Sequence, residues 1–330
     1  MVEDAGAAVG VVIGTWNVEN LCRPLAPGSP PSGRCAAKDR AAYEAKLEGL
    51  AATVDRLAPD LLGVQEVGGP EALADLVERL DGAWHTALSK HADRRGIRVG
   101  FLSRRPLTVT EDRTAFPEHL PRVQVEDDGT TIKRMGRGAL AVRWSPVAGH
   151  SVDVVVCHLK SKLLTFPGNR HSTDDEELRA RYGAYALYRR AAEAVTLRAM
   201  ADRLLQGDGA AHEVIVMGDL NDEFEAATTQ ILYGPPGSQI GTGGFRDTDL
   251  GDPRRLWNLA PHLLEKGGFS RIFEGQKELI DHILVSRGVL DRVEKVFTGH
   301  ERLPTVEEAR PAAAHDSPSD HAPVLAELVY

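Results

Sequence analysis

The sequence is poor in aromatic residues and in basic charge, and it has no long apolar run. Phe, Trp and Tyr make up 5% of the 330 residues, so the tyrosines are expected to pack in the protein rather than to form a platform for stacked bases. The 39 Lys and Arg residues against 48 Asp and Glu residues give a net charge of −9. This balance excludes a histone-like nucleic-acid-coating protein but leaves a local basic groove open. No apolar run approaches the ~20 residues of a membrane-spanning helix.

Cysteine is also scarce, and the three cysteines are Cys22, Cys35 and Cys157. None of them has C-x-x-C spacing, which argues against a zinc ribbon or a thioredoxin-type redox centre. Cys157 lies in an apolar run and is expected to be a small core residue. Cys22 and Cys35 flank a loop rich in Pro and Gly and would pair in an exported protein, but an odd number of cysteines favours a reducing compartment. Because Met1–Asp4 has no signal-peptide character, we expect unpaired cysteines and a cytoplasmic location, with secretion as the alternative.

What the sequence does contain is typical of a globular α/β protein. Hydrophobic residues make up 42% of the chain and charged residues 26%, which is an ordinary composition. Helical spacing of apolar residues predicts helices from Asp39 to Leu57, from Pro70 onward and over residues 174–206. No linker divides the chain, so residues 1–330 are expected to form a single domain. Short runs rich in Val, Ile and Leu predict strands at Gly10–Trp16, Leu61–Val67, Ile97–Ser103, Ala139–Trp144, Val152–Leu159, Glu213–Asp219, Leu279–Ser286 and Ala322–Val329.

Polar side chains stand where several of these strands end. Asn17 follows the first strand, Glu66 lies at the end of the second, and His158 ends the run that starts at Val152. Asp219 ends the run that starts at Glu213, and Asn221 follows two residues later. Because α/β sheets bind ligands beyond the ends of their strands, these side chains are expected at one shared edge.

The residue types at this edge suit a metal ion and a phosphate. Asn17, Glu66 and Asp320 offer oxygen ligands, too few for an all-protein calcium site but typical of an Mg²⁺ or Mn²⁺ ion that keeps water and binds phosphate. Asp219 and Asn221, at positions i and i+2 of an extended chain, point the same way. One of them can therefore orient an attacking water while the other hydrogen-bonds a phosphate oxygen.

Two further motifs contain an acid and a histidine. Asp281, followed by His282, interrupts an apolar strand, and the pair Asp320-His321 precedes another. An acid inside a strand needs a partner, for which a histidine is suited. His282 is expected to point to the opposite face of that strand and to be structural. Asp222 is expected to cap a helix that begins directly after it, and Glu19 either lies beside the metal or is solvated.

In combination, these motifs resemble the endonuclease/exonuclease/phosphatase superfamily, which has the DNase I-like fold. The resemblance covers nearly the whole chain in the same order. It implies a four-layer α/β sandwich, in which two packed mixed β-sheets are flanked by helices, and a metal-dependent phosphoric ester hydrolase that uses Mg²⁺ or Mn²⁺. The residues that carry it are Asn17, Gln65-Glu66, His158, Gly218-Asp219-Leu220-Asn221, Asp281 and Ser319-Asp320-His321.

The resemblance also implies a role for each residue on the metal side. Glu66 would be the principal metal ligand, with Asn17 beside it and Asp320 close by. Asp219 and Asn221 would position the nucleophile and the scissile phosphate.

On the other side of the phosphate, His321 would contact the phosphoryl group and exchange protons, oriented by Asp281. His158 would stabilise the developing oxyanion. Which of these groups is the formal base is left open.

The substrate is predicted from the neighbouring basic residues. The segment His158–Lys162 is most similar to bacterial extracellular-type nucleases, which favours a phosphodiesterase or nuclease that cleaves DNA or RNA. Arg95, Arg137, Lys160 and Lys162, with Asn17, are expected to bind the substrate, because several cations together track a phosphate backbone. The alternative is a phosphatase or phosphodiesterase of a small phosphorylated metabolite, nucleotide or lipid head group, held in a closed pocket near Leu163–Tyr182. The protein is expected to be a monomer.

Overall fold

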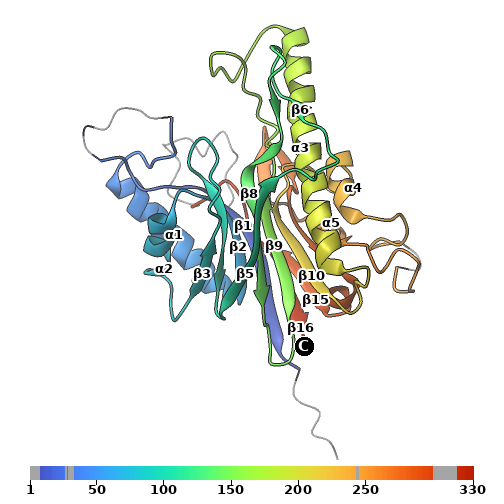
Figure 1. Ribbon diagram of the computed structural model, residues 1–330. Helices are drawn as coiled ribbons and strands as arrows, with labels where there is room; N and C mark the ends of the chain where they lie inside the picture. The colour runs from blue at the N-terminus through green and yellow to red at the C-terminus, as the bar shows by residue number, and fades with distance from the viewer. Residues whose placement is uncertain (1–7, 27, 29–32, 243–244, 300–317) are drawn as a thin grey trace, which may run out of the picture.

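In the computed structural model, which describes residues 8–26, 28, 33–242, 245–299 and 318–330, two six-stranded sheets form the centre of the molecule (Figure 1). The first sheet joins both ends of the chain, because its first strand pairs with the last strand on one side and with the second strand on the other. The strand order is β15 (Val293–Thr298), β16 (Val324–Val329), β1 (Gly10–Leu21), β2 (Leu61–Val67), β4 (Arg98–Ser103) and β3 (His85–Leu88).

The second sheet contains the strands that end in Asp219 and His158 and the strand that begins at Asp281. Strands β9 and β10 run parallel, whereas β10 and β14 run antiparallel, so the sheet is mixed. Its order is β11 (Trp257–Asn258), β14 (Asp281–Val285), β10 (Glu213–Asp219), β9 (Val152–His158), β8 (Arg134–Trp144) and β5 (Leu107–Ala115). Two short hairpins accompany it, β6 (Val123–Gln124) with β7 (Thr131–Ile132) and β12 (Arg271–Phe273) with β13 (Gln276–Glu278).

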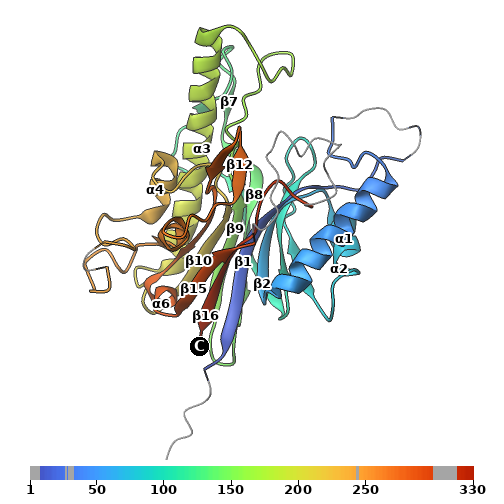
Figure 2. The ribbon, with the colours of Figure 1, turned by 180° about the vertical axis from the view of Figure 1, so that it is seen from behind.

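Helices cover the outer faces of both sheets. Helices α1 (Arg40–Leu57) and α2 (Pro70–Val77) pack on the first sheet, and α3 (Glu176–Leu205) and α4 (Ala227–Tyr233) pack on the second (Figures 1 and 2). Two short helices, α5 (Ala260–Leu264) and α6 (Arg287–Leu290), lie in the C-terminal third of the chain. The predicted four-layer sandwich is confirmed. No helix among the described residues combines the length and apolar character needed to cross a membrane.

The main core fills the space between the two sheets. Ile13 and Phe101 of the first sheet and Val154 and Ile215 of the second belong to one buried cluster. The sheets approach closely at Gly63, where an added Cβ would lie 3.0 Å from both Met217 Sδ and Val156 Cγ2. Because the interior is this closely packed, neither sheet can shift without displacing the side chains of the other. The relative position of the two sheets is therefore closely defined.

The helix predictions agree well with the structure. Helix α1 has the predicted bounds, and its cap Asp39 accepts a hydrogen bond of 2.8 Å from the backbone N–H of Ala42. Helix α3 has 30 residues, which corresponds to a length of about 45 Å, and it continues through Gly183 without interruption. Its N-terminal half rises beyond the edge of the sheets (Figure 1).

The expectation that Cys22 and Cys35 are unpaired is wrong. The two residues form a disulfide bond, with their Cα atoms 5.9 Å apart. The backbone brings them together, because Ala37 N–H donates to the Cys22 carbonyl at 3.2 Å and Cys35 N–H donates to the Arg95 carbonyl at 2.8 Å. Cys157 is a free, buried cysteine as predicted.

Candidate active site

Three strand ends of the second sheet bring three ionisable side chains together. In the strand register, Asp219 is the partner of Asp281 on β14 and of His158 on β9. His321 comes from the segment just before β16 and forms an isolated bridge with Arg271 of β12. The site therefore uses both sheets. Asp219 and His158 share one edge as predicted, and Asp281 and His321 join them there.

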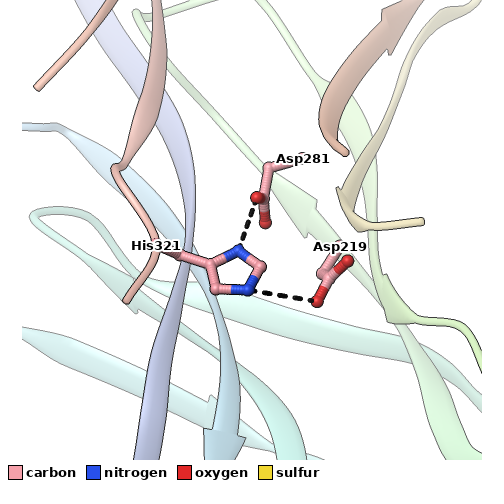
Figure 3. A group of neighbouring side chains, drawn as sticks. All are labelled: Asp219, Asp281 and His321. Atoms are coloured by element: carbon pink, nitrogen blue, oxygen red, sulfur yellow. Dashed lines mark hydrogen bonds and ion pairs between the residues drawn. The ribbon is translucent and has the colours of Figure 1, made fainter. Parts of the chain in front are cut away.

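His321 lies between two carboxylates (Figure 3). Its Nδ1 is 2.7 Å from Asp281 Oδ2, and its Nε2 is 4.0 Å from Asp219 Oδ2. The main chain around His321 is held by Ser319, whose Oγ accepts the His321 N–H at 3.0 Å and donates to the Asn17 carbonyl at 2.6 Å. The imidazole is thus fixed in position and orientation.

The charges of this group affect one another because all three side chains are buried. Burial alone would lower the pKa of His321, but the carboxylates, Asp281 first, outweigh burial and raise it to about 10. Burial and the neighbouring Asp281 raise the pKa of Asp219 to about 7. At neutral pH, His321 is therefore an imidazolium and Asp219 is close to its titration midpoint, as suits a group that accepts a proton.

Asp219 is held at both carboxylate oxygens. Asn17 Nδ2 donates to Oδ2 at 3.0 Å, and the Asn221 backbone N–H donates to Oδ1 at 2.8 Å. Asn221 has a left-handed backbone, with φ of 53°, and its Nδ2 donates to the Leu159 carbonyl at 3.1 Å. Gly218 is required before Asp219, because a Cβ there would lie 2.0 Å from the Cys157 carbonyl oxygen at φ of +148°.

His158 completes this side of the site. Its Nε2 lies 3.3 Å from Asp219 Oδ2, while its buried Nδ1 has no hydrogen-bond partner among the described residues. Burial, followed by the positive charges of Arg137 and His321, lowers its pKa well below the ordinary value. His158 is therefore neutral beside Asp219.

A second group, the carboxylate cluster, consists of Glu19, Glu66 and Asp320. Asp320 N–H donates to Glu19 Oε2 at 3.2 Å, and Asn20 N–H donates to Glu66 Oε2 at 3.0 Å. Burial and then the charge of Asp320 raise the pKa of Glu19 to about 7, with a smaller contribution from Glu66. Glu19, Asn20 and Glu66 all have positive φ, 46°, 51° and 65°. Such strained conformations concentrate at functional sites.

The donors of the carboxylate cluster fit a divalent cation. They are all carboxylate oxygens, which hard cations prefer, and the pKa of Glu19 is raised first by burial and then by the negative charge of Asp320. Asn17 Oδ1, also predicted as a ligand, accepts the Glu19 N–H at 3.0 Å. Among the described residues, Asp219, Asp281 and His321 are the only three possible ligands whose atoms all lie within 4.8 Å of one another, so the oxygens of the carboxylate cluster are spaced more widely. The short contact between His321 Nδ1 and the Asp281 carboxylate is, however, that of a hydrogen-bonded acid and histidine.

The predicted basic residues differ in their surroundings. Arg95 NH1 donates to Asn20 Oδ1 at 3.1 Å, and its NH2 lies 3.8 Å from Glu66 Oε1. Arg137 lies 3.4 Å from Asp93 and donates to the Leu159 carbonyl at 3.3 Å. Both guanidinium groups act on the pKa of His158, so they lie at the site.

The two lysines are bound to protein oxygens instead. Lys160 Nζ donates to the carbonyls of Ser161 at 2.8 Å and Leu163 at 2.6 Å, within its own loop. Lys162 Nζ lies 3.4 Å from Glu278 Oε1 and 3.9 Å from Asp222 Oδ1. The charge of Lys160 nevertheless acts on His158, as those of Arg137 and Arg95 do.

Asp222 does not cap a helix. Helix α4 begins at Ala227, and Asp222 Oδ2 instead accepts hydrogen bonds from Arg190 at 3.0 Å and from the Thr228 hydroxyl at 2.6 Å. His282 faces away from the site as predicted, since its Nε2 contacts the Asp222 carbonyl oxygen at 2.9 Å.

Sequence reasoning also missed Glu193 of α3, which is 1% exposed. It accepts the backbone N–H groups of Lys160 at 2.6 Å and Gly136 at 3.0 Å. A glutamate among the apolar positions of a long helix is the signal that would have indicated it.

The two packed sheets carry a hydrogen-bonded acid and histidine, a second buried aspartate and the carboxylate cluster. This combination of fold and side chains is that of a metal-dependent phosphoester hydrolase. The sequence agrees with this class. Residues 14–321 match the Endonuclease/Exonuclease/phosphatase family, and the chain belongs to that family.

The solved structures that resemble this one share the fold. Truncated Caenorhabditis elegans TDP2 has a TM-score of 0.54 at 16% sequence identity, covering 97% of this chain and 98% of that one. An endonuclease/exonuclease/phosphatase family protein from Bacteroides thetaiotaomicron has a TM-score of 0.53 at 14% identity, covering 98% and 96%. A mannosyl-6-phosphatase of the same species has a TM-score of 0.52 at 14% identity, covering 97% and 100%. None of the curated proteins matches the sequence significantly.

Proposed function

We propose that this protein is a phosphodiesterase, a nuclease that cleaves DNA or RNA by in-line attack of an activated water. The observation that carries the chemistry is the contact of 2.7 Å between His321 and Asp281, with Asp219 beside them. The pKa of His321 is raised to about 10 and that of Asp219 to about 7. His321 can therefore act as the positively charged group while Asp219 acts as the base.

In this proposal, Asp219 accepts the proton of the attacking water, and Asn17 and the Asn221 backbone fix the direction of its lone pairs. Two hydrogen bonds from the protein to its oxygens hold the carboxylate in one orientation, which favours reaction by positioning.

On the opposite side of the phosphate, the His321 imidazolium would contact a phosphoryl oxygen. Asp281 stabilises the protonated form of His321 and fixes its orientation. His158 offers an N–H where negative charge develops. The Asn221 side-chain amide, one N–H of which donates to the Leu159 carbonyl, would hydrogen-bond the scissile phosphate through its other N–H.

Glu66 and Asp320, with Glu19 and Asn17 beside them, would hold an Mg²⁺ or Mn²⁺ ion. When bound, the ion supplies positive charge to the phosphoryl oxygens. The protein's own contribution is the charge and the rigidity of the carboxylate cluster, in which the backbone of Glu19 and Glu66 lies in the left-handed region, as does that of the adjacent Asn20.

Arg95 and Arg137 are proposed to bind the phosphate groups of the substrate. Arg95 is 44% exposed and so is accessible to a ligand, whereas Arg137 is 12% exposed and tethered by Asp93. Lys160 and Lys162 would bind a substrate only by giving up their bonds to the protein. That observation favours the second candidate, a small phosphorylated molecule that needs few cations.

The disulfide bond supports a location outside the reducing cytoplasm. Disulfide bonds persist in oxidising compartments and are rare in the cytosol. We therefore favour the alternative of an exported protein over the cytoplasmic location expected from the sequence, and we propose that the protein acts there as a monomer.

The test is hydrolysis of plasmid DNA, single-stranded DNA, RNA, a chromogenic phosphodiester and a phosphomonoester, each with Mg²⁺, Mn²⁺ or EDTA. His321→Ala should lose the activity, whereas His85→Ala should keep it, because His85 is exposed and pairs with Ser103 at the opposite end of the sheet from Glu66. Metal-dependent cutting of polymer that disappears in His321→Ala supports a nuclease. Turnover of the small esters alone moves the assignment to the second candidate.

A further inference from the structure

A lysine lies inside the carboxylate cluster. Lys46 of α1 has its Nζ 3.8 Å from Glu19 Oε2, and its side chain is 19% exposed. Burial lowers the pKa of Lys46, and the negative charges of Glu19, Asp320 and Glu66 oppose that effect. The ammonium thus lies beside Glu19, and the charges of Asp320 and Glu66 act on it as well.

The ammonium is held in place from two sides. Lys46 Nζ donates a hydrogen bond of 2.8 Å to the carbonyl oxygen of Pro318, two residues before Asp320. One turn along α1, Gly49 packs so tightly against Pro318 that an added Cβ would lie 2.9 Å from the proline Cβ. Helix α1 therefore positions Lys46 and the segment that carries Asp320 as one unit.

The charges of the cluster can be counted. Its three carboxylates carry three negative charges when ionised, which one divalent ion and one ammonium balance. A second divalent ion would produce an excess of positive charge and would have to lie close to the ammonium. Arg95 also approaches Glu66, at 3.8 Å, but it is 44% exposed, and its charge is screened by solvent and available to a phosphate.

We propose that Lys46 is a positioning residue that provides the resident positive charge of the carboxylate cluster and limits the cluster to one divalent ion. The proposal rests on the metal-dependent function above. Before the metal arrives, the ammonium reduces repulsion among Glu19, Glu66 and Asp320, so the ligands are already in place. Once the metal is bound, the ammonium repels a second cation.

The experiment is a titration with Mn²⁺ of the full-length protein, followed by isothermal calorimetry and by the electron paramagnetic resonance signal of free Mn²⁺. We expect the wild type to bind one Mn²⁺ per chain. Lys46→Met should bind Mn²⁺ about tenfold more tightly or take up a second ion, since repulsion between adjacent charges is worth about that much even in water. Lys46→Arg should behave as the wild type does, and Lys266→Met, an exposed lysine, should change nothing.

Two results would overturn the proposal: a wild type that binds two Mn²⁺ ions, or a Lys46→Met protein with the stoichiometry and affinity of the wild type. Circular dichroism checks that each variant is folded. If Lys46→Met does not fold, Lys46→Gln takes its place, with the same expectation. If neither the wild type nor any variant binds Mn²⁺, the metal site itself is refuted. This result differs from the two that overturn the role of Lys46, so the experiment distinguishes failure of the proposed function from failure of this proposal.

Discussion

Asp281→Asn removes the negative charge beside His321 while it keeps the size of the side chain. The two groups are 2.7 Å apart and buried. Burial by itself would lower the pKa of His321, and Asp281 makes the largest of the contributions that raise it to about 10. In the variant, burial is opposed by weaker charges, so the pKa of His321 falls and the imidazolium is lost at neutral pH.

The same carboxylate also acts on Asp219, whose pKa is raised to about 7 by burial and then by Asp281. In the wild type, the rate should rise through a pH of about 7 as Asp219 ionises and fall through about 10 as His321 loses its proton. Removal of Asp281 lowers both pKa values, so both limbs of the profile should move to lower pH. At mildly alkaline pH, kcat should fall by about 10²–10⁴-fold, the usual contribution of a positioned acid–base group.

The assay is the pH dependence of kcat and kcat/KM on a chromogenic phosphodiester at saturating Mg²⁺. Asp291→Asn is the matched control, because Asp291 is 64% exposed and lies outside the site. Melting temperatures check that both variants are folded. An Asp281→Asn enzyme that is folded and keeps the kcat and both limbs of the wild type would refute the assignment of charge to His321.

Three further predictions follow from the structure. Gly218→Ala should destabilise the protein by about 3 kcal/mol or more in chemical denaturation, because its Cβ would lie 2.0 Å from the Cys157 carbonyl oxygen; an unchanged denaturation midpoint would contradict this geometry. Cys22→Ser should lose about 2–4 kcal/mol of stability. Dithiothreitol should produce the same loss in the wild type and no further loss in the variant, so an effect of dithiothreitol on the variant would count against the pairing with Cys35. In metal-free protein, the rise of the Glu19 pKa from 4.5 to about 7 makes its contribution to stability decrease as pH increases through that range. Added Mn²⁺ should therefore raise the melting temperature more at alkaline than at acidic pH, and an equal rise at both would argue against a metal at this cluster.

The sequence predicts the buried elements of this fold well because their signal is local. Leu61–Val67 and Glu213–Asp219 have the predicted bounds, since each is an apolar run buried on both faces. Strand β5, Leu107–Ala115, was not predicted, because it is an edge strand with no fully buried residue. Strand β15, Val293–Thr298, has one buried residue and was missed for the same reason.

The candidate site could be predicted only in part, for a related reason. The apolar runs that end in Asp219 and His158 predict these two side chains at one edge, and they are partners in the strand register. The sequence puts Asp281 inside a strand, whereas it is the first residue of β14. Nothing in the sequence around Lys46 distinguishes it from an ordinary solvated lysine of an amphipathic helix. Its position depends on how α1 packs against Pro318, which is a tertiary contact without a local signal. The pairing of Cys22 with Cys35 depended in the same way on long-range backbone hydrogen bonds.

The pairing of β1 with β16 has a consequence for how the active site folds. Trp16 Nε1 donates to the His321 carbonyl at 2.8 Å, and Ser319 Oγ donates to the Asn17 carbonyl at 2.6 Å, so segments about 300 residues apart are joined inside the site. A chain in which β16 has not yet paired with β1 leaves one edge of β1 unpaired and does not bring His321 to Asp281. Closure of the first sheet and assembly of the acid–base group are therefore one folding event.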